Sequence, residues 1–193
     1  CNDEISSSHP GGTEIYNDAD DDCNKTVDDG CDDDGDNYCD DGMIVVGTPK
    51  ICTAGSGDCD DKAAAVSPGA TEDCNGIDDD CDTKIDLDDT DLSKSAPPCA
   101  KQQGVCKGST TPTSLCVKAA WQACTAAEYL KHDTQYVTDA EELLCDDLDN
   151  NCDGLVDEKC DVDGDGYCAS TKTTVGKPKA CAQGGGDCND GKN

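Results

Sequence analysis

Oxygen-bearing side chains recur at alternate positions in several short stretches of this chain, a spacing that is suited to holding a metal ion. In the stretch 149–157 they stand at positions 1, 3, 5 and 9, with a glycine at position 6 and an apolar residue at position 8. Alternate carboxylates in a tight loop turn their oxygens toward one point, and Ca²⁺ takes about six to eight oxygen ligands. The stretch therefore predicts a calcium loop with the ligands Asp149, Asn151, Asp153 and Asp157.

This pattern matches the first nine residues of an EF-hand-type loop and occurs twice more, at 20–28 and 78–86. In these two copies the glycine at position 6 is replaced, by Lys25 and Thr83, so we expect a weaker turn there. The ligands predicted in these copies are Asp20, Asp22, Asn24 and Asp28, and Asp78, Asp80, Asp82 and Asp86.

A second class of acidic loop has no acidic residue at position 12, where Met43 and Lys172 stand. Its closing carboxylate must come from another segment, and the Gly-Asp-Cys segments are the natural donors. The predicted ligands are Asp32, Asp34 and Asp36 with Asp58, Asp60 and Asp61, and Asp161, Asp163 and Asp165 with Asp187, Asn189 and Asp190. Five loops in all predict about five calcium ions, and solvated acidic loops without metal are the alternative.

The composition agrees with a cation-binding protein and excludes several other classes. Acidic residues number 44 against 14 lysines and no arginine, the net charge is −30, and phenylalanine is absent. So little apolar surface normally predicts disorder, but the 18 cysteines indicate a disulfide scaffold made in an oxidising compartment. We therefore expect a secreted or cell-surface protein. Its charge repels nucleic acid and anionic membranes, and no membrane-spanning run is present.

Internal repeats set the organisation of the chain. The stretches 10–24 and 68–82 align without a gap at an offset of 58, and five cysteines from Cys23 to Cys59 recur as Cys152 to Cys188 at an offset of 129. The predicted domains are a module at 1–58, the first part of a second module at 59–98, an insertion at 99–144 and a resumed module at 145–193. We expect a loop-dominated repeat protein with little regular structure and short β-hairpins, forming an elongated array of calcium-stapled modules.

The repeated cysteine spacings favour disulfides between near neighbours in the sequence. In the first module the spacing leaves Cys1 and Cys23 over, and we expect these to pair; Cys1 bonding to another segment or subunit is the alternative. The local scheme predicts the bridges Cys1–Cys23, Cys31–Cys39, Cys52–Cys59, Cys74–Cys81, Cys145–Cys152, Cys160–Cys168 and Cys181–Cys188.

The insertion at 99–144 has a different character. Apolar residues at Val105 and 115–117 flank the turn sequence GSTTPTS, which predicts a hairpin in a small β-rich subdomain, and Thr125 begins a capping box for a short helix. We expect Trp121 to be a core residue. Three pairings are open to its cysteines, which are expected to bond among themselves: Cys99, Cys106, Cys116 and Cys124.

Copper and zinc are the alternatives to calcium, and catalysis is the alternative to binding. Copper and zinc favour imidazole or thiolate, yet the chain has two histidines, His9 and His132, in unrelated contexts, and no Cys-x-x-Cys pair. Without arginine or a spacing that joins a nucleophile to a base, we do not expect an enzyme.

The stretch GDCDDKAAAVSPGATEDCNGIDDDCD at 57–82 resembles the metal-binding motif named after the bacterial protein MopE. That family occurs in secreted and surface proteins of myxobacteria and related bacteria, and the segment with QQGVCKG and WQAC resembles a frequent companion of the motif. The resemblance covers nearly the whole chain. The family label mentions copper, but with two histidines we carry over only the acidic motif, as calcium ligands. The acidic runs are also similar to thrombospondin type 3 repeats, which wrap around calcium with little core.

Two binding functions follow as hypotheses. The first is a calcium-binding structural protein of the cell surface, either a stalk or a filament subunit that associates with itself head to tail. The second is a surface adhesin or glycan-binding module that uses the insertion as its reader, with other surface proteins or glycans as partners.

Overall fold

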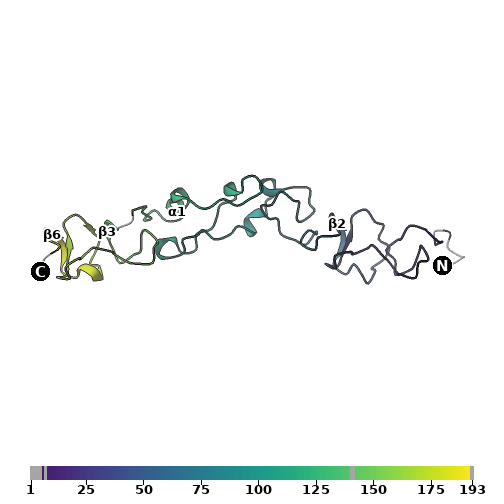
Figure 1. Ribbon diagram of the computed structural model, residues 1–193, viewed down its shortest axis with the longest axis horizontal. Coiled ribbons are helices and arrows are strands. Elements are labelled where there is room, and N and C mark those ends of the chain that lie inside the picture. The colour runs from purple at the N-terminus through teal and green to yellow at the C-terminus, as the bar shows by residue number, and fades with distance from the viewer. Residues whose placement is uncertain (1–5, 7, 140–141, 192–193) are drawn as a thin grey trace. The chain divides into compact units, whose positions relative to one another are not determined.

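Regular secondary structure is sparse in this protein (Figure 1). The computed structural model describes residue 6, residues 8–139 and residues 142–191, and most of these form turns and loops. They fall into two compact units, Cys1–Ser95 with Lys118–Ala120, and Ala96–Val117 with Trp121–Asn193. The predicted loop-dominated, disulfide-rich repeat fold is confirmed. In the described part of the chain, no helix is long and apolar enough to span a bilayer.

The first unit is built around one pair of parallel strands. Strand β1 (Tyr38–Asp40) pairs with β2 (Gly55–Asp58), and a single parallel bridge joins Tyr16 to Val45. The 3₁₀ turns η1 (Asp86–Asp88) and η2 (Leu92–Lys94) follow. Its core is a small cluster made of Tyr16, Cys31, Cys39 and Cys52 with Met43, Val45 and Ile51 packed against it.

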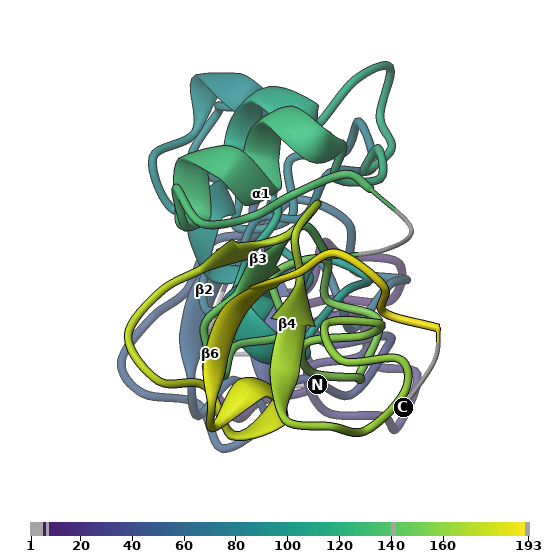
Figure 2. The ribbon, with the colours of Figure 1, turned by 90° about the vertical axis from the view of Figure 1, so that its left-hand side faces the viewer.

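The second unit repeats this arrangement with every residue number raised by 129. Strand β4 (Tyr167–Ala169) lies parallel beside β6 (Gly184–Asp187), as Figure 2 shows. The pair β3 (Leu144–Cys145) and β5 (Thr173–Thr174) stands where the first unit has its single bridge, and η5 (Lys179–Cys181) precedes β6. Since 167 − 38 and 184 − 55 both equal 129, the sequence offset describes a real structural repeat.

Every strand pair among the described residues runs parallel, so the expected short β-hairpins are wrong for these pairs; antiparallel pairing is confined to two isolated bridges at the insertion, Pro98–Thr110 and Cys116–Trp121. Parallel strands cannot be joined by a two-residue turn and need a longer connection. Here the connection between β1 and β2 is a loop closed by the disulfide Cys39–Cys52, and Cys168–Cys181 closes its counterpart between β4 and β6. An isolated pair of strands is only marginally stable, so these disulfides supply the stability that further strands would provide in a wider sheet.

The insertion is helical and turn-rich rather than β-rich. The predicted hairpin is wrong because Val105 and Leu115 lie in the 3₁₀ turns η3 (Gly104–Cys106) and η4 (Thr113–Leu115). The expected capping box is present: Thr125 and Glu128 cap α1 (Ala126–His132). Trp121 is half-buried and lies outside the buried cluster of the insertion, which consists of Cys99, Cys106, Tyr129, Tyr136 and Cys152.

The disulfides connect segments that are farther apart than the local scheme expects. The bonds are Cys39–Cys52, Cys59–Cys81, Cys99–Cys124, Cys106–Cys152, Cys145–Cys160 and Cys168–Cys181. Cys23, Cys74 and Cys116 are disulfide-bonded as well. These bonds contradict the predicted pairs Cys31–Cys39, Cys52–Cys59, Cys74–Cys81, Cys145–Cys152, Cys160–Cys168 and Cys181–Cys188. The predicted pair Cys1–Cys23 includes a residue outside the described part of the chain.

The backbone of the first-class loops bears on two of these predicted pairs, Cys74–Cys81 and Cys145–Cys152. The cysteine at the fourth position of each loop, Cys23, Cys81 or Cys152, is in the left-handed conformation, with φ between 59° and 68°. The chain turns back at this residue, so the cysteine faces another segment than the cysteine that precedes the loop. Within the insertion only Cys99–Cys124 forms, because Cys106 reaches out to Cys152; the prediction that its four cysteines form a closed set is wrong.

Candidate metal centres

The three loops of the first class, 20–28, 78–86 and 149–157, share one pattern of hydrogen bonds. In the third loop, the Asp149 carboxylate accepts the backbone N–H groups of Asp153 (3.1 Å) and Gly154 (3.0 Å). Asp20 and Asp78 accept the equivalent pairs of N–H groups in the first and second loops. The carboxylate at position 1 therefore holds the backbone of each loop in a tight turn. The sequence pattern predicts such a turn for a cation site.

The glycine at position 6 turns out to be replaceable. Gly154 has a φ of 98°, and its equivalents Lys25 and Thr83 adopt the same left-handed conformation at 82° and 77°. A non-glycine residue is uncommon in this region of the Ramachandran map, and the conformation costs it free energy. The first and second loops thus keep the turn at a cost that Gly154 does not incur.

The carboxylates at position 9 hold the chain before the loop rather than pointing into the loop. Asp157 accepts the backbone N–H groups of Asp146 (2.8 Å) and Asp147 (3.0 Å), one with each oxygen. Asp28 makes the equivalent bonds to 17–18, and Asp86 accepts the N–H groups of 75–76 with one oxygen, Oδ1. The geometry therefore gives these three residues a clamping role and does not favour their predicted role as ligands.

Sequence reasoning missed a buried glutamate that organises each of these loops. Glu142 is fully buried and accepts the N–H groups of Asn150, Asn151 and Asp157. Glu72, also fully buried, accepts those of Asp79 and Asp86. The third member of the set is Glu14, which is 8% exposed and accepts Asp22 N–H.

Unpaired carboxylate oxygens gather beside these loops. Glu14, Asp22 and Asp29 each bring one oxygen to within 4.8 Å of the others, and Glu14 Oε2 and Asp29 Oδ1 are buried without a hydrogen-bond partner among the described residues. Glu72, Asp78 and Asp80 form the matching group in the second loop. At the third loop both oxygens of Glu158 are buried, and the carboxyl group lies beside that of Asp153. Glu158 is the residue that follows the clamp Asp157, as Asp29 follows Asp28.

The second loop contains a cation of its own. Lys84 forms an ion pair with Asp82, which stands at position 5, and this contact lowers the pKa of Asp82. The two side chains are about half and one-third exposed, so the pair is worth little in stability. It nevertheless occupies the carboxylate at position 5 of this loop, and we expect the second loop to bind a metal ion least tightly.

Burial raises the pKa values of several carboxyl groups at these sites. The pKa of Glu158 is raised to about 7 by burial, with the adjacent Asp153 adding to the shift. Burial also raises the pKa values of Glu14, Glu72 and Asp80, and nearby carboxylates add to each shift. Such groups are costly to ionise unless a cation compensates them.

The metal-free protein is expected to lose stability as the pH rises. Raised carboxyl pKa values mean that the folded chain binds protons more tightly than the unfolded chain between about pH 4.5 and 7, the interval set by Glu158. Stability then falls with pH throughout that interval. Thermal melting in EGTA at pH 5, 6, 7 and 8 measures the slope. The Glu158→Gln variant should flatten it, and an equal slope in both proteins would contradict the assignment to Glu158.

The second class of loop lies beside the strand pairs. Asp32, Asp34 and Asp36 bring one oxygen each to within 4.8 Å of one another, and Asp58 at the end of β2 faces Asp34 and Asp36. Burial and these two neighbours raise the pKa of Asp58. Asp61 instead accepts the N–H of Asp33 (3.1 Å).

The second unit repeats this arrangement. Asp187 ends β6 near Asp163, and Asp190 accepts Val162 N–H (2.8 Å) as Asp61 accepts Asp33 N–H. The side chains of Asp60 and Asn189 are exposed. Among the predicted closing ligands, the structure therefore favours Asp58 and Asp187 over the residues that follow them.

The donor atoms at these sites suit a hard cation better than copper or zinc. The buried sulfurs of Cys145, Cys160 and Cys168 lie close together but belong to disulfides. Cys31 is a free thiol whose pKa burial raises to about 12, so it stays protonated and is no thiolate ligand. His9 lines a cavity of about 460 Å³ in the first unit together with Glu14 and Met43.

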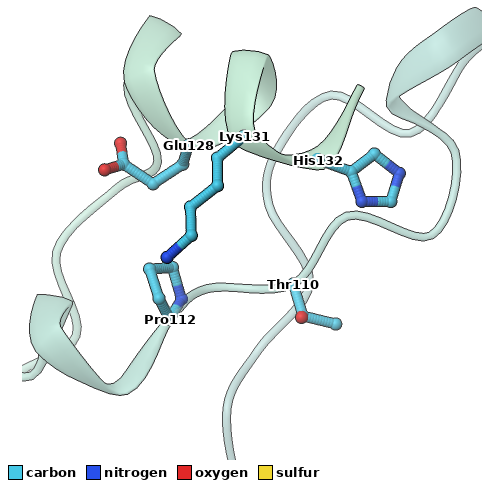
Figure 3. Close-up of a pocket in the computed structure, with 5 residues that line it drawn as sticks. All are labelled: Thr110, Pro112, Glu128, Lys131 and His132. Atoms are coloured by element: carbon cyan, nitrogen blue, oxygen red, sulfur yellow. The ribbon is translucent and has the colours of Figure 1, made fainter. Parts of the chain in front are cut away.

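A small pocket opens on α1 in the insertion (Figure 3). It has a volume of about 190 Å³ and is lined by Thr110, Pro112, Glu128, Lys131 and His132. Lys131 extends toward Pro112, and the His132 ring lies within 3.1 Å of the Lys107 carbonyl. The pocket combines two basic side chains with one carboxylate, Glu128, which also caps the helix.

One comparison with known proteins identifies the first class of loop. The family model Cu-binding_MopE, described as "Putative metal-binding motif", matches residues 1–29, 58–86 and 133–158. The three matches contain the three loops 20–28, 78–86 and 149–157, so the MopE-type repeat expected from the sequence is present. No curated protein and no solved structure matches the chain. The second class of loop, at 32–36 and 161–165, lies outside all three matches.

Proposed function

We propose that this metal-binding, disulfide-rich protein with three MopE-type motifs is a calcium-binding structural protein that works outside the cell. Calcium ions and disulfides would together take the place of the hydrophobic core that its composition cannot form. The calcium role goes beyond the family description, which names copper and a metal-binding motif.

The observation that carries the proposal is the set of buried carboxylate oxygens at the first and third motif loops. Glu14 Oε2 and Asp29 Oδ1 have no hydrogen-bond partner within the described part of the chain, and the buried Glu158 carboxyl has only another carboxylate, Asp153, beside it. A buried carboxylate without a partner is strongly unfavourable, and a divalent cation is the partner that would satisfy several at once. Oxygen-only donor sets in flexible loops favour Ca²⁺ over copper or zinc.

The location and the structural role are supported by charge and covalent chemistry. Six disulfides joining described residues are typical of proteins exposed to an oxidising compartment. A net charge of −30 disfavours nucleic acid and anionic membranes as partners. We infer a secreted or cell-surface stalk, or a filament subunit that contacts further copies of itself head to tail, and not an enzyme.

Thermal unfolding of the oxidised protein in calcium and in EGTA tests the calcium role. Ligand binding to the folded state at 100 times Kd adds about 2.7 kcal/mol per site, so several sites should raise the melting temperature by well over 10 °C. Glu158→Gln should lose part of the increase, and the exposed Asp139→Asn should keep all of it. A melting temperature that is the same in calcium and EGTA would overturn the calcium role. Stabilisation by copper alone would favour a site that includes His9.

Assembly is tested separately by sedimentation velocity and light scattering with and without calcium. Large species that appear only with calcium support the filament version. A monodisperse monomer in calcium at all concentrations removes the filament and leaves the stalk.

The adhesin alternative relies on the pocket at α1 (Figure 3). Its basic pair, Lys131 and His132, would suit an acidic sugar better than the acidic loops would. A glycan array on wild-type protein and on Lys131→Met tests this alternative. Equal, blank arrays for the two proteins would reject it.

A further inference from the structure

Three carboxylates in the first unit are each held by one oxygen and leave the other oxygen free. Asp34 Oδ1 accepts the N–H of Asp36 (3.2 Å), Asp36 Oδ1 accepts that of Tyr38 (2.7 Å), and Asp58 Oδ1 accepts that of Asp60 (2.9 Å). Each bond is made to the residue two positions later, and it fixes the carboxylate. The second oxygen of each group is thereby oriented as well.

All three of these second oxygens are buried and lack a hydrogen-bond partner in the described part of the chain. They are Oδ2 of Asp34, Asp36 and Asp58, and the Asp58 side chain is fully buried. Asp32, which belongs to the same cluster of carboxylates, already accepts the N–H groups of Gly35 (2.7 Å) and Asn37 (3.1 Å). A buried carboxylate next to two others is costly to ionise, and a bound cation would compensate the charge of all three.

The second unit contains the same arrangement, and this repetition argues against chance. Asp163 Oδ1 accepts the N–H of Asp165 (3.3 Å), Asp165 Oδ1 that of Tyr167 (2.8 Å) and Asp187 Oδ1 that of Asn189 (2.8 Å). Oδ2 of Asp163 and Oδ2 of Asp187 are again buried and unpaired.

The middle repeat keeps the family motif but lacks this arrangement. At an offset of 58, Thr90, Leu92 and Lys94 stand where the first module has Asp32, Asp34 and Asp36. Leu92 is fully buried there, in place of a carboxylate. A first-class loop therefore occurs in this chain without a second-class loop after it, so the second class does not follow automatically from the first.

We propose that the protein has a second kind of divalent-cation site, whose acidic loop lies outside the MopE-type matches and is closed by an aspartate at the end of a β-strand. One site uses Asp34, Asp36 and Asp58 with Asp32, and the other uses Asp163, Asp165 and Asp187 with Asp161. The ligands are all carboxylate oxygens, which suits Ca²⁺. The inference deepens the calcium role proposed above and depends on it for the identity of the ion.

The site ties together two segments that a strand pair alone would hold weakly. Asp34 and Asp36 precede β1, and Asp58 ends β2, so an ion bound by all three would join the loop before β1 to the end of β2. The hydrogen bond from Asp33 N–H to Asp61 already draws the loop toward this segment. The ion would therefore act as a second staple for β1 and β2.

Calcium stoichiometry, measured by equilibrium dialysis on the oxidised full chain, tests the proposal. We compare wild type with Asp58→Asn, Asp187→Asn and the double variant, and use Asp60→Asn as the matched control because Asp60 is adjacent and exposed. Loss of one ligand should weaken its site by at least ~10-fold, so each single variant should bind one ion fewer at limiting calcium, and the double variant two fewer. Hydrogen exchange in β1 or β4 should accelerate only in the variant of the same unit.

The outcomes separate this inference from the calcium role. Wild type that binds no calcium overturns both. Wild type that binds calcium, with Asp58→Asn and Asp187→Asn behaving like Asp60→Asn, overturns the strand-closed site and leaves the motif sites standing. Peptide mapping of Cys39–Cys52 verifies that the Asp58→Asn chain has folded. Asp34→Asn, which changes a half-buried residue, provides a second variant that should lose the same ion.

Discussion

Replacing Glu142 with glutamine is expected to lower the free energy of unfolding by about 3 kcal/mol or more, with or without calcium. Glu142 is fully buried, and its two oxygens accept three backbone N–H groups, those of Asn150, Asn151 (3.1 Å) and Asp157 (2.7 Å). In the amide one oxygen becomes an NH₂ group, which must face an N–H donor. The variant then loses charge-assisted hydrogen bonds and leaves at least one buried donor unpaired.

The matched control for Glu142→Gln is Asp139→Asn, which removes the same charge from an exposed position three residues earlier. Removing a negative charge from a chain of net charge −30 relieves repulsion, and the control measures that gain. Denaturant unfolding in EGTA provides both values. Glu72→Gln should behave like Glu142→Gln, since Glu72 accepts Asp79 N–H (2.9 Å) and Asp86 N–H (2.6 Å). Equal unfolding midpoints for Glu142→Gln and Asp139→Asn would show that the glutamate does not organise its loop.

The glutamates illustrate which part of the site was predictable. Alternate carboxylates are visible in sequence because position along a tight loop decides where each side chain points. Glu14 and Glu72 align at the offset of 58, so a signal existed, but a single glutamate outside an acidic run resembles an ordinary surface residue. The offset of 71 places the third copy at Leu143, one residue after Glu142, and this shift hides the equivalence.

Unlike the glutamates, the aspartates that end β2 and β6, Asp58 and Asp187, could be predicted from the sequence. The second-class loops lack an acidic residue at position 12, so a partner segment had to exist, and the Gly-Asp-Cys segment recurs with the loop at the offset of 129. Asp58 is favoured over Asp60 and Asp61 because it is fully buried, lies near Asp34 and Asp36, and keeps one oxygen without a hydrogen-bond partner among the described residues. Sequence spacing indicated the segment, and burial within the folded chain distinguishes the residue.

The disulfides could not be read from spacing, because each connects segments that only the fold brings together. Cys106 of the insertion bonds to Cys152 in the third motif loop, 46 residues away. The insertion approaches this loop so closely that a Cβ on Gly104 would lie 2.0 Å from the Asp149 carbonyl oxygen. Val105 N–H and the Lys101 ammonium group donate to the carbonyls of Asp149 (3.1 Å) and Asn151 (2.7 Å). No pairing rule based on neighbours in sequence anticipates an insertion that packs on a distant repeat.

Substituting Tyr16 by cysteine is expected to create a disulfide with Cys31. The two units differ here in one respect: Cys145 bonds to Cys160 in the second, whereas the equivalent residues of the first, at an offset of 129, are Tyr16 and the free thiol Cys31. Tyr16 and Cys31 are both fully buried in one cluster, and the Tyr16 hydroxyl donates to the Gly30 carbonyl (3.0 Å). The backbone therefore already has the arrangement that holds the bridge in the other unit.

The decisive result is a count of thiols in the unfolded chain. Burial raises the pKa of Cys31 to about 12, so it reacts slowly in the folded protein, and titration must be done in guanidinium chloride. Tyr16→Cys adds one cysteine yet should show one thiol fewer than wild type, while the control Tyr16→Ser should equal wild type. Closing a 15-residue loop contributes about 3 kcal/mol, and losing a buried aromatic ring costs about 3 to 5 kcal/mol, so the melting temperature should fall less in Tyr16→Cys than in Tyr16→Ser. One thiol more than wild type would mean that the two units differ in backbone as well as in sequence, and that Tyr16 is there because a bridge cannot form.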